Sequence, residues 1–435
     1  MDEAVLSFDD MSVWMESCAL TGAAAFFAGL RGCAVIVNGP LWCYLFTQRH
    51  IEQSQSDISH RMKCTQLDND AIVFGAEAYL REALQPHIEQ PPALLAVISG
   101  SSASLIGDDV GAIARAAGVT CPVVAIDSGG LIGSFADGWA RASCATLDVL
   151  LRETQGEVRR GVNLIGMTSS YYNGENDARE LVRLLTGAGY EVRHVFGCDM
   201  PLASIGDLAQ AELNIVVHDE LGLPAAKYIE ERCGTPYIAP LPPYGRAGTR
   251  RWLATIFAAL PPTRGEDAVA EIAVAERRDF LRINDLKNTW GELLFDTALI
   301  RAPRSSAWGL AEALRTEWAD VRHLAVAAQL REDAAAAQIA DEQLSETDTT
   351  RAQELLTAME RGLLIGSSSE SVLADPRRML YVPVSYPVVD RLHISDQPFM
   401  GLRGARHIED TLWNGSVLSA SCLSAQVCTD KTVIL

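Results

Sequence analysis

The sequence predicts an α/β fold in three successive layers, each with a mostly parallel sheet. Short apolar runs end in Gly, Ser or Asp, as buried strands do where they leave a sheet. Amphipathic segments lie between these runs, and alternation of strand and helix is typical of parallel sheets covered by helices. The phosphate-binding glycine spacings are missing, so the layers are expected to be Rossmann-like (flavodoxin-like) without a nucleotide fingerprint.

The first layer is expected within residues 1–158. Its strands are the apolar runs at 35–37, 93–100 and 122–127. Residues 108–118 read as an amphipathic helix, because an acidic start and a glycine stop enclose an apolar stripe.

The second layer is expected within residues 159–285. Residues 161–197 read as a β–α–β unit, and further strands are expected at 213–219 and 235–245. The helix of the unit has candidate caps and stops, which are Asn176 or Asp177 at its start and Gly187 or Gly189 at its end.

The third layer is expected within residues 286–435. Residues 295–327 form another β–α–β pattern, and strands are expected at 362–369 and 378–387. The polar, Ala-rich stretch at 329–362 has helical character, and its charge run indicates a solvated helix face.

Charge and composition exclude several classes of function. The formal net charge of −20 argues against a nucleic-acid or membrane-surface protein, because such surfaces need clustered Lys and Arg. No stretch is long enough for a transmembrane helix, and the acidic N-terminus lacks the features of a signal peptide. We therefore expect a cytoplasmic protein whose ten cysteines are not disulfide-bonded.

Five motifs stand in a recognisable order. The first, CALTGAAAFFAGLRGCAVIVNGPLWC, runs from Cys18 to Cys43 and places the second cysteine just after a strand and a Gly-Pro turn. The others are CTQLDNDAIVFGAEAYL (64–80), AVISGSSASLIGDDVGAI (96–113), GSFADGW (133–139) and YPVVDRLHISDQPFMGLRGARHIEDTLWN (386–414).

Together these motifs make the chain resemble the nitrogenase component 1 superfamily, and within it the β-type subunits, over residues 18–414. The resemblance implies an iron–sulfur cluster, [4Fe-4S] or P-cluster-like, shared with a partner subunit. Cys18 and Cys43 match two ligand positions of the family. Soft thiolates on stiff turns are the ligands that such a cluster needs.

The departures from the family pattern concern the remaining ligands. Ser101 stands where the family has a third cysteine, and Gly130 stands near a family serine. Cys64 and Ser101 are both possible third ligands; for Cys64 the alternative is a half-buried loop thiol. Asn38 replaces a usual His, and Trp42 replaces a usual Gly. A tryptophan would be strained at positive φ, so either the turn differs or the indole covers the cluster.

Other candidates are weaker. His218 follows a second-layer strand near the position where α-type chains carry a cofactor cysteine; it is a weak catalytic candidate against a strand-end polar residue. His393 and His407 are expected to be structural or to lie at the subunit interface. The spacing of Cys422 and Cys428 matches no metal signature. Core or edge positions are expected for Cys33, Cys121, Cys144, Cys198 and Cys233.

The resemblance implies an electron-relay subunit that passes electrons from an ATP-dependent iron–sulfur reductase to a paired α-type subunit, as an α2β2 complex. Reduction of methylthio-alkanes or tetrapyrroles is a better analogy than reduction of N2, because family ligands are missing. Two alternatives stay open. One is a scaffold on which a cofactor precursor is assembled, and the other is a structural subunit without a cluster.

Overall fold

The computed structural model describes residues 17–52, 54, 57–129, 131, 133–152, 161–330, 338–391 and 394–430, without the side chains of residues 72 and 417–430. The described residues form two compact units. The N-terminal unit comprises Ser17–Ala178 and Tyr190–Pro240. The C-terminal unit comprises Arg179–Gly189 and the chain from Leu241 onward.

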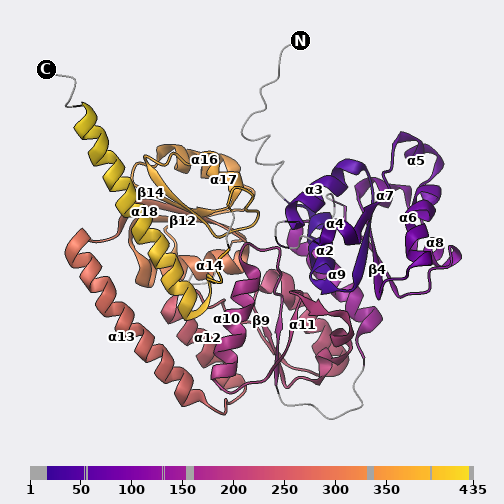
Figure 1. Cartoon of the computed structure of the whole chain (residues 1–435), viewed down its shortest axis with the longest axis horizontal. Coiled ribbons are helices and arrows are strands. Elements are labelled where there is room, and N and C mark those ends of the chain that lie inside the picture. Colours follow the sequence, from indigo (N-terminus) through magenta and orange to yellow (C-terminus); the bar gives the residue numbers. More distant parts are fainter. Residues whose placement is uncertain are drawn as a thin grey trace. The chain divides into compact units, whose positions relative to one another are not determined.

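The first sheet of the N-terminal unit is parallel and has the strand order β3-β2-β4-β5. Figure 1 labels β4 of this sheet, with α6 and α8 to its right. Its strands are β2 (Cys33–Asn38), β3 (Met62–Cys64), β4 (Leu94–Ser99) and β5 (Val123–Asp127). The helices of this layer are α2 (Ala19–Ala28), α3 (Leu41–Ile51), α4 (Ile58–Arg61), α5 (Asn69–Phe74), α6 (Glu77–Glu89), α7 (Ser101–Ile106), α8 (Val110–Ala116) and α9 (Phe135–Leu150).

Two sets of helices cover the two faces of this sheet. Apolar side chains of α6 and α8 pack on one face, where Leu80, Leu84 and Ile113 meet Ile36 and Val97. Helix α2 also contacts this sheet, at β2 and β4, and all ten of its residues are buried. A strand buried on both faces reads as a continuous apolar run, which is why β2 and β4 were recognisable in the sequence.

The second sheet is also parallel and has the order β10-β9-β6-β7. Its strands are β6 (Val162–Ile165), β7 (Val192–Phe196), β9 (Leu213–Val216) and β10 (Tyr237–Ile238), with α10 (Gly174–Gly187), a 3-10 helix (Leu202–Gln210) and α11 (Asp219–Cys233). Helix α10 begins before the predicted caps Asn176 and Asp177, because Asn173 at φ 69° turns the chain and its carbonyl accepts both their N–H groups. Gly187 ends the helix, as predicted.

A mixed core joins these two layers inside the N-terminal unit. Phe26 of α2 packs edge-to-face on Trp139 of α9 and on Phe196 of β7, with ring centroids 5.0 and 5.4 Å apart. The short strands β1 (Leu30–Arg31) and β8 (Met200–Pro201) pair in parallel. The first layer is therefore held against the second by buried aromatic area.

The C-terminal unit contains a five-stranded parallel sheet of order β13-β12-β11-β14-β15. Its strands are β11 (Leu294–Arg301), β12 (Asp320–Ala327), β13 (Glu342–Leu344), β14 (Gly362–Gly366) and β15 (Met379–Pro383). Its helices are α12 (Gly245–Ala259), α13 (Gly265–Trp290), α14 (Arg304–Ala313), a π-helix (Leu314–Trp318), α16 (Thr349–Ala358), α17 (Ser368–Ser371) and α18 (Gly401–Asp430).

The predicted helical character of residues 329–362 is wrong in part. Residues 331–337 lie outside the description, and α16 is helical, but Glu342–Leu344 form the edge strand β13. This strand pairs in register with Ala325–Ala327 of β12. A short polar segment carries little strand signal of its own, and pairing with the sheet decides its conformation.

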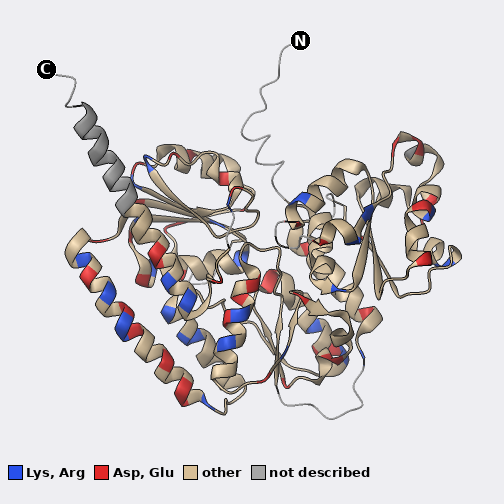
Figure 2. Cartoon of the chain, in the orientation of Figure 1, with Lys and Arg blue, Asp and Glu red and all other residues tan. Residues whose placement is uncertain are grey.

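Charged side chains in the C-terminal unit gather in two ways. Helix α13 carries Lys, Arg, Asp and Glu along its length (Figure 2). A second group is buried: the Arg246 guanidinium of α12 contacts Asp279, Glu317 and Glu409, which come from α13, the π-helix and α18. This ion-pair network ties four helices together, and Asp279 also pairs with Arg278 and Arg406 at its edge.

The predicted fold class is confirmed: the chain is α/β, with three mostly parallel, Rossmann-like sheets. The division into domains 1–158, 159–285 and 286–435 stays a prediction; residues 285 and 286 lie inside α13. In the part of the chain that the structure describes, no helix combines the length and apolarity needed to cross a membrane.

Candidate functional site

Cys43 lies where the sequence places it, just past a buried strand. Strand β2 ends at Asn38, Gly39 and Pro40 form the turn, and α3 begins at Leu41. The Cys43 side chain is half-buried in the first turn of that helix. In this sheet β2 lies between β3 and β4. The chain runs from β2 to β3 on one side and then crosses to β4 on the other side. Such a switch in strand order opens a crevice at the carboxyl ends of the strands, where ligands commonly bind in α/β proteins.

Cys18 reaches the same neighbourhood from another element. It is the N-cap of α2 and forms an isolated antiparallel bridge with Ser134, the N-cap of α9. The Ala19 N–H also donates to the Gly133 carbonyl at 3.1 Å. Both helix starts are therefore fixed together, and Cys18 is half-buried between them.

Two glycines let these helices approach so closely. A Cβ on Gly22 would overlap the Phe135 carbonyl, and a Cβ on Gly138 would overlap the Ala19 carbonyl. Glycine lacks a Cβ and allows backbone-to-backbone contact. The Gly-Ala run after Cys18 and the Gly-Trp pair in α9 thus have a structural reason.

Cys64 is the last residue of β3, beside the turn that leads to Cys43. Its Sγ lies 3.4 Å from the Gly39 carbonyl oxygen and 3.9 Å from that of Pro40. The side chain is half-buried. It lies at the end of a strand paired with β2, where the sequence alternative was a half-buried loop thiol; its role as a ligand stays a prediction.

Electrostatics show that the three thiols share one neighbourhood. Burial raises the pKa of the Cys43 thiol, and a charge on Cys18 raises it further. Burial also raises the pKa of Cys64; the Gln66 N–H opposes that shift, and a charge on Cys43 adds to it. A charge on Cys18 thus acts on Cys43, and a charge on Cys43 acts on Cys64, so a cation bound beside them would favour the Cys43 and Cys64 thiolates.

Ser101 occupies the start of α7, after β4. Its Oγ accepts a hydrogen bond from the Leu131 N–H at 3.5 Å, and a Cβ on Gly129 would overlap Ser101. The serine is therefore packed against the loop that follows β5. Its hydroxyl already has a backbone partner there.

The two departures beside Cys43 have clear conformations. Asn38 is buried; its amide Nδ2 donates to Ser99 Oγ at 3.4 Å, and its Oδ1 accepts from Thr65 Oγ1 at 3.1 Å. Trp42 belongs to α3 and is not among the described residues with positive φ. The turn therefore differs from one that demands glycine, and the indole carries no backbone strain.

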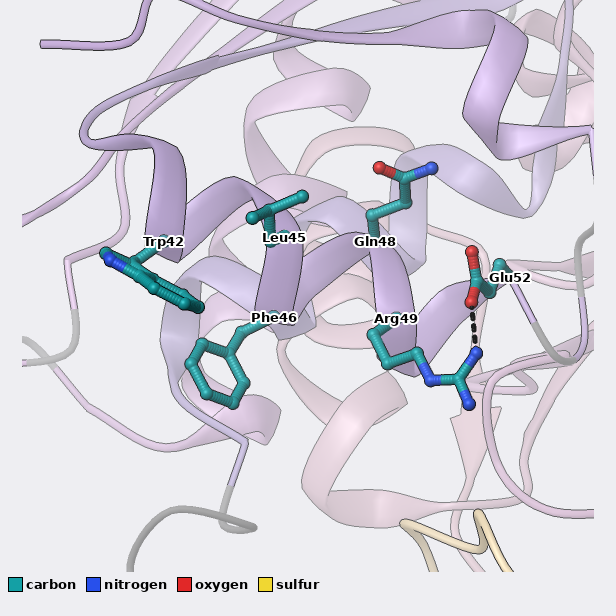
Figure 3. Close-up of a pocket in the computed structure, with 6 residues that line it drawn as sticks. All are labelled: Trp42, Leu45, Phe46, Gln48, Arg49 and Glu52. Atoms are coloured by element: carbon teal, nitrogen blue, oxygen red, sulfur yellow. Dashed lines mark hydrogen bonds and ion pairs between the residues drawn. The ribbon is translucent and has the colours of Figure 1, made fainter.

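Helix α3 presents an apolar face to solvent beside Cys43. Leu41, Trp42, Leu45 and Phe46 are 45, 71, 41 and 37 % exposed. Trp42 and Phe46 lie on the same side of the helix, and Arg49 pairs with Glu52 at its far end (Figure 3). A shallow groove of about 410 Å³ runs along this face and is lined by Trp42, Leu45, Phe46, Gln48, Arg49 and Glu52.

His218 is the N-cap of α11. It is buried, and burial lowers its pKa to about 4, so the imidazole is neutral at pH 7. Its ring packs edge-on against Tyr171, with centroids 4.9 Å apart, and Nδ1 lies 3.8 Å from Glu220 Oε1. It is more than an isolated strand-end residue, but these contacts assign it no catalytic role.

The structure describes some of the other sequence candidates and leaves out the rest. His407 is structural: Nδ1 lies 2.9 Å from the Pro398 carbonyl oxygen, and the ring stacks on Phe399. Gly130 and His393 lie outside the described residues, as do the side chains of Cys422 and Cys428. The predicted core or edge cysteines are buried or half-buried, namely Cys33, Cys121, Cys144, Cys198 and Cys233.

Two residues of the site escaped the sequence reasoning. Thr65 holds the turn at Gly39, and Gln66 adopts a φ of 57°. Neither residue belongs to a sequence motif that would indicate such a role, and glutamine does not favour positive φ. Only the pairing of β3 with β2 brings them to the site.

The residues fit a cluster better than a single ion. Within the described ranges, no group of three or more His, Cys, Asp or Glu side chains could hold one metal ion. The thiolates of an iron–sulfur cluster bind different irons, so their sulfur atoms stand farther apart than the ligands of one ion. Three half-buried thiols, at a helix N-cap, in a first helical turn and at a strand end, match the soft donor set that such a cluster requires.

Comparison with curated proteins finds distant relatives. The B component of the light-independent protochlorophyllide reductase of Synechococcus sp. (strain JA-3-3Ab) is 24% identical over 378 residues, covering 81% of this chain and 73% of that protein. The component of the same name from Methylobacterium sp. (strain 4-46) is 24% identical over 420 residues, covering 90% and 78%. The nitrogenase iron-molybdenum cofactor biosynthesis protein NifE of Clostridium pasteurianum is 27% identical over 234 residues, covering 52% and 50%.

Comparison with solved structures supports the same fold. The structure described as nitrogenase Cp1 at pH 6.5 superposes with a TM-score of 0.75 at 17% identity, over 92% of each chain. The profile of the nitrogenase component 1 type oxidoreductase family matches residues 18–415, which span the cysteine site and all three sheets. The chain therefore belongs to the nitrogenase component 1 type oxidoreductase family.

Proposed function

We propose that this chain is the β-type electron-relay subunit of a nitrogenase-like, ATP-dependent reductase complex. An iron–sulfur cluster held in part by Cys18 and Cys43 would receive electrons from a separate iron–sulfur reductase and pass them to a paired α-type subunit. The observation that carries the proposal is the gathering of half-buried thiols at the carboxyl ends of β2 and β3. To relay electrons, this chain needs a cluster, an apolar shell around the cluster and a docking face for its partners.

The paired subunit is proposed to cover the exposed face of α3. This face lies on the same helix as Cys43, so a cluster shared between subunits would lie next to it. Exposed aromatic and aliphatic side chains in one patch, bordered by a charged pair, are typical of an interface. The α2β2 assembly follows from the family and is part of the proposal.

The substrate is proposed to be something other than N2. The two reductase relatives named above are components of light-independent protochlorophyllide reductase, so tetrapyrrole-type reduction is the nearer analogy and methylthio-alkane reduction a second. The replacement of family ligand positions by Ser101 and Gly130 also separates this chain from an ordinary nitrogenase.

Anaerobic purification with the products of neighbouring genes tests the proposal. The complex should contain iron and acid-labile sulfide, give a paramagnetic signal on reduction and turn over only with ATP and the reductase protein. Cys18→Ala together with Cys43→Ala should remove iron and signal. A complex that holds no iron, or keeps it in the double variant, would contradict the proposal and favour a structural subunit.

An assembly scaffold is the second candidate. The match to the cofactor biosynthesis protein NifE is the observation that favours it. A scaffold would release a labile metal precursor to another protein and show no reductant-dependent turnover. Transfer of radioactive iron from the purified complex to a recipient protein, without substrate reduction, would decide for this function.

A further inference from the structure

The last residues of β3 are locked to the turn that precedes Cys43. Val37 and Cys64 face each other in the parallel register of β2 and β3. Beyond the strand, the Thr65 N–H donates to the Val37 carbonyl and the Leu67 N–H to the Gly39 carbonyl, each at 3.0 Å. Backbone bonding thus continues past Cys64 and fixes the strand end against the turn.

Buried side chains reinforce that connection. Thr65 Oγ1 accepts from the Gly39 N–H at 3.0 Å and donates to Asn38 Oδ1 at 3.1 Å. Asn38 in turn donates to Ser99 Oγ, so the ends of β2, β3 and β4 share one network. A fully bonded buried network is rigid, and a cluster ligand needs a rigid support. Asn38, which replaces the family His, thereby contributes to the position of Cys64.

The backbone after Cys64 is arranged to serve its sulfur. Gln66 has a φ of 57°, and its N–H donates to Cys64 Sγ at 3.3 Å. A glutamine in the left-handed region is uncommon, and such conformations concentrate at functional sites. Hydrogen bonds to the sulfurs are one of the means by which proteins tune iron–sulfur clusters.

We propose that Cys64 is the third thiolate ligand of the cluster in this chain, in place of the serine at position 101. The inference rests on the proposed function. On ligation the Cys64 S–H bond breaks, its proton leaves to solvent, and the sulfur electron pair forms a bond to iron; no electron is transferred. The S–H contact to the Gly39 carbonyl is lost, and the Gln66 N–H continues to donate to the sulfur.

Ser101 is the competing ligand, and its surroundings disfavour it. Its Oγ accepts from the Leu131 N–H, and the loop at Gly129 packs against it. An alcohol is a harder and far less acidic donor than a thiol, so iron in a cluster prefers sulfur. Cys64 has the softer donor atom, a position beside Cys43 and an N–H directed at its sulfur.

Four variants of the whole complex, purified anaerobically with its partner, test this assignment. They are Cys64→Ala, Cys64→Ser, Ser101→Ala and the control Cys121→Ala, which removes another half-buried thiol of the same layer. The measurements are iron and sulfide per complex, and the electron paramagnetic resonance spectrum after reduction. Recovery of the partner and far-ultraviolet circular dichroism report folding.

Cys64→Ala should contain less iron than the wild type and change the spectrum, because one iron of the cluster loses its sulfur ligand. Cys64→Ser should keep its iron and change the spectrum, because oxygen replaces sulfur on one iron. Ser101→Ala and Cys121→Ala should match the wild type. If Cys64→Ala cannot be recovered folded, the Cys64→Ser spectrum decides.

A wild-type spectrum and iron content in Cys64→Ala, or a wild-type spectrum in Cys64→Ser, would overturn the assignment. Loss of iron in Ser101→Ala would do the same and restore the serine as ligand. Failure of the proposed function would give different results. The wild-type complex would then contain no iron, or the complex would keep its iron when both Cys18 and Cys43 are replaced by alanine.

Discussion

The Gln66 N–H donates to Cys64 Sγ at 3.3 Å, from a backbone with a φ of 57°. This contact connects an unusual conformation to one of the three thiols of the candidate site, namely Cys18, Cys43 and Cys64. It depends on the preceding pairing of β3 with β2, which sets the direction of the chain after Cys64. The strength of that support, and of the packing around it, can be measured.

Thr65→Val tests the network that holds the Cys64 strand end. The substitution removes the acceptor of the buried Gly39 N–H and the donor to Asn38 with little change in volume. The free energy of unfolding should fall by about 1–3 kcal/mol, since a buried donor is left unpaired. Urea unfolding of the purified chain measures this. Thr255→Val, which removes an exposed hydroxyl in α12, is the control and should have a much smaller effect.

Gly22→Ala should destabilise the junction of α2 and α9. The added Cβ would overlap the Phe135 carbonyl, so the helices must separate, and overpacking of this kind costs about 1–3 kcal/mol. Thermal unfolding followed by circular dichroism should show a lower Tm. Gly187→Ala is the matched helical control, because the nearest atom to its added Cβ would be a Glu271 carboxylate oxygen 3.8 Å away. Equal Tm values would contradict the close approach of the helices.

Trp42→Ser should weaken pairing with the α-type subunit. The indole is 71% exposed in the chain alone and would be buried by the proposed partner. Loss of a large aromatic anchor commonly costs about 2 kcal/mol or more, which corresponds to roughly a 30-fold increase in Kd. Sedimentation of mixed subunits at graded concentrations measures the Kd. Phe280→Ser, at a 68% exposed aromatic of α13, is the control, and an equal effect of both variants would argue against α3 as the interface.

His218 should make stability fall as the pH falls. Its folded pKa of about 4 lies below its ordinary value of 6.5, because burial disfavours the charged imidazole. The unfolded chain therefore binds the proton more readily, and stability present above pH 6.5 is lost as the pH falls toward 4. The loss should reach about 3 kcal/mol. Urea unfolding at pH 7 and pH 4 measures it. His218→Gln should reduce the difference, and an unchanged difference would assign it to other groups.

Arg246→Ala should destabilise the C-terminal unit. It leaves Asp279, Glu317 and Glu409 without their shared guanidinium, and loss of one partner from a buried ion pair costs about 3–5 kcal/mol. Burial raises the pKa of Glu317 and of Glu409, because it disfavours the charged carboxylates. The stability that comes from protonating these two buried carboxyls is lost as the pH rises through their raised pKa values.

The effect of Arg246→Ala should therefore be larger at pH 7 than at pH 5, where these carboxyls take up protons more readily. Urea unfolding at both pH values measures the two losses. Arg250 lies on the same helix as Arg246 and forms a more exposed pair with Glu276 of α13, so Arg250→Ala should change stability by less than about 1 kcal/mol. A pH-independent loss in Arg246→Ala would mean that the carboxyls stay charged throughout.

The sequence was informative wherever one short segment carries its own signal. Strands β2 and β4 are apolar up to their last residue, and α8 has its acidic cap and an apolar stripe. Cys18 and Cys43 were recognisable because a motif order, and not a contact, identified them. The start of α10 was missed, since a turn at Asn173 sets it. Strand β13 was missed because the neighbouring strand imposes its conformation.

By itself, then, the sequence determined the α/β class, the parallel layers and the two family cysteines, because local periodicity and motif order encode them. Only the tertiary structure decided that Cys64 lies beside Cys43, that the Gln66 N–H meets its sulfur, and that one face of α3 is exposed. These are relations between segments separated along the chain. Strand register and helix packing create them, and neither is written in any single stretch of residues.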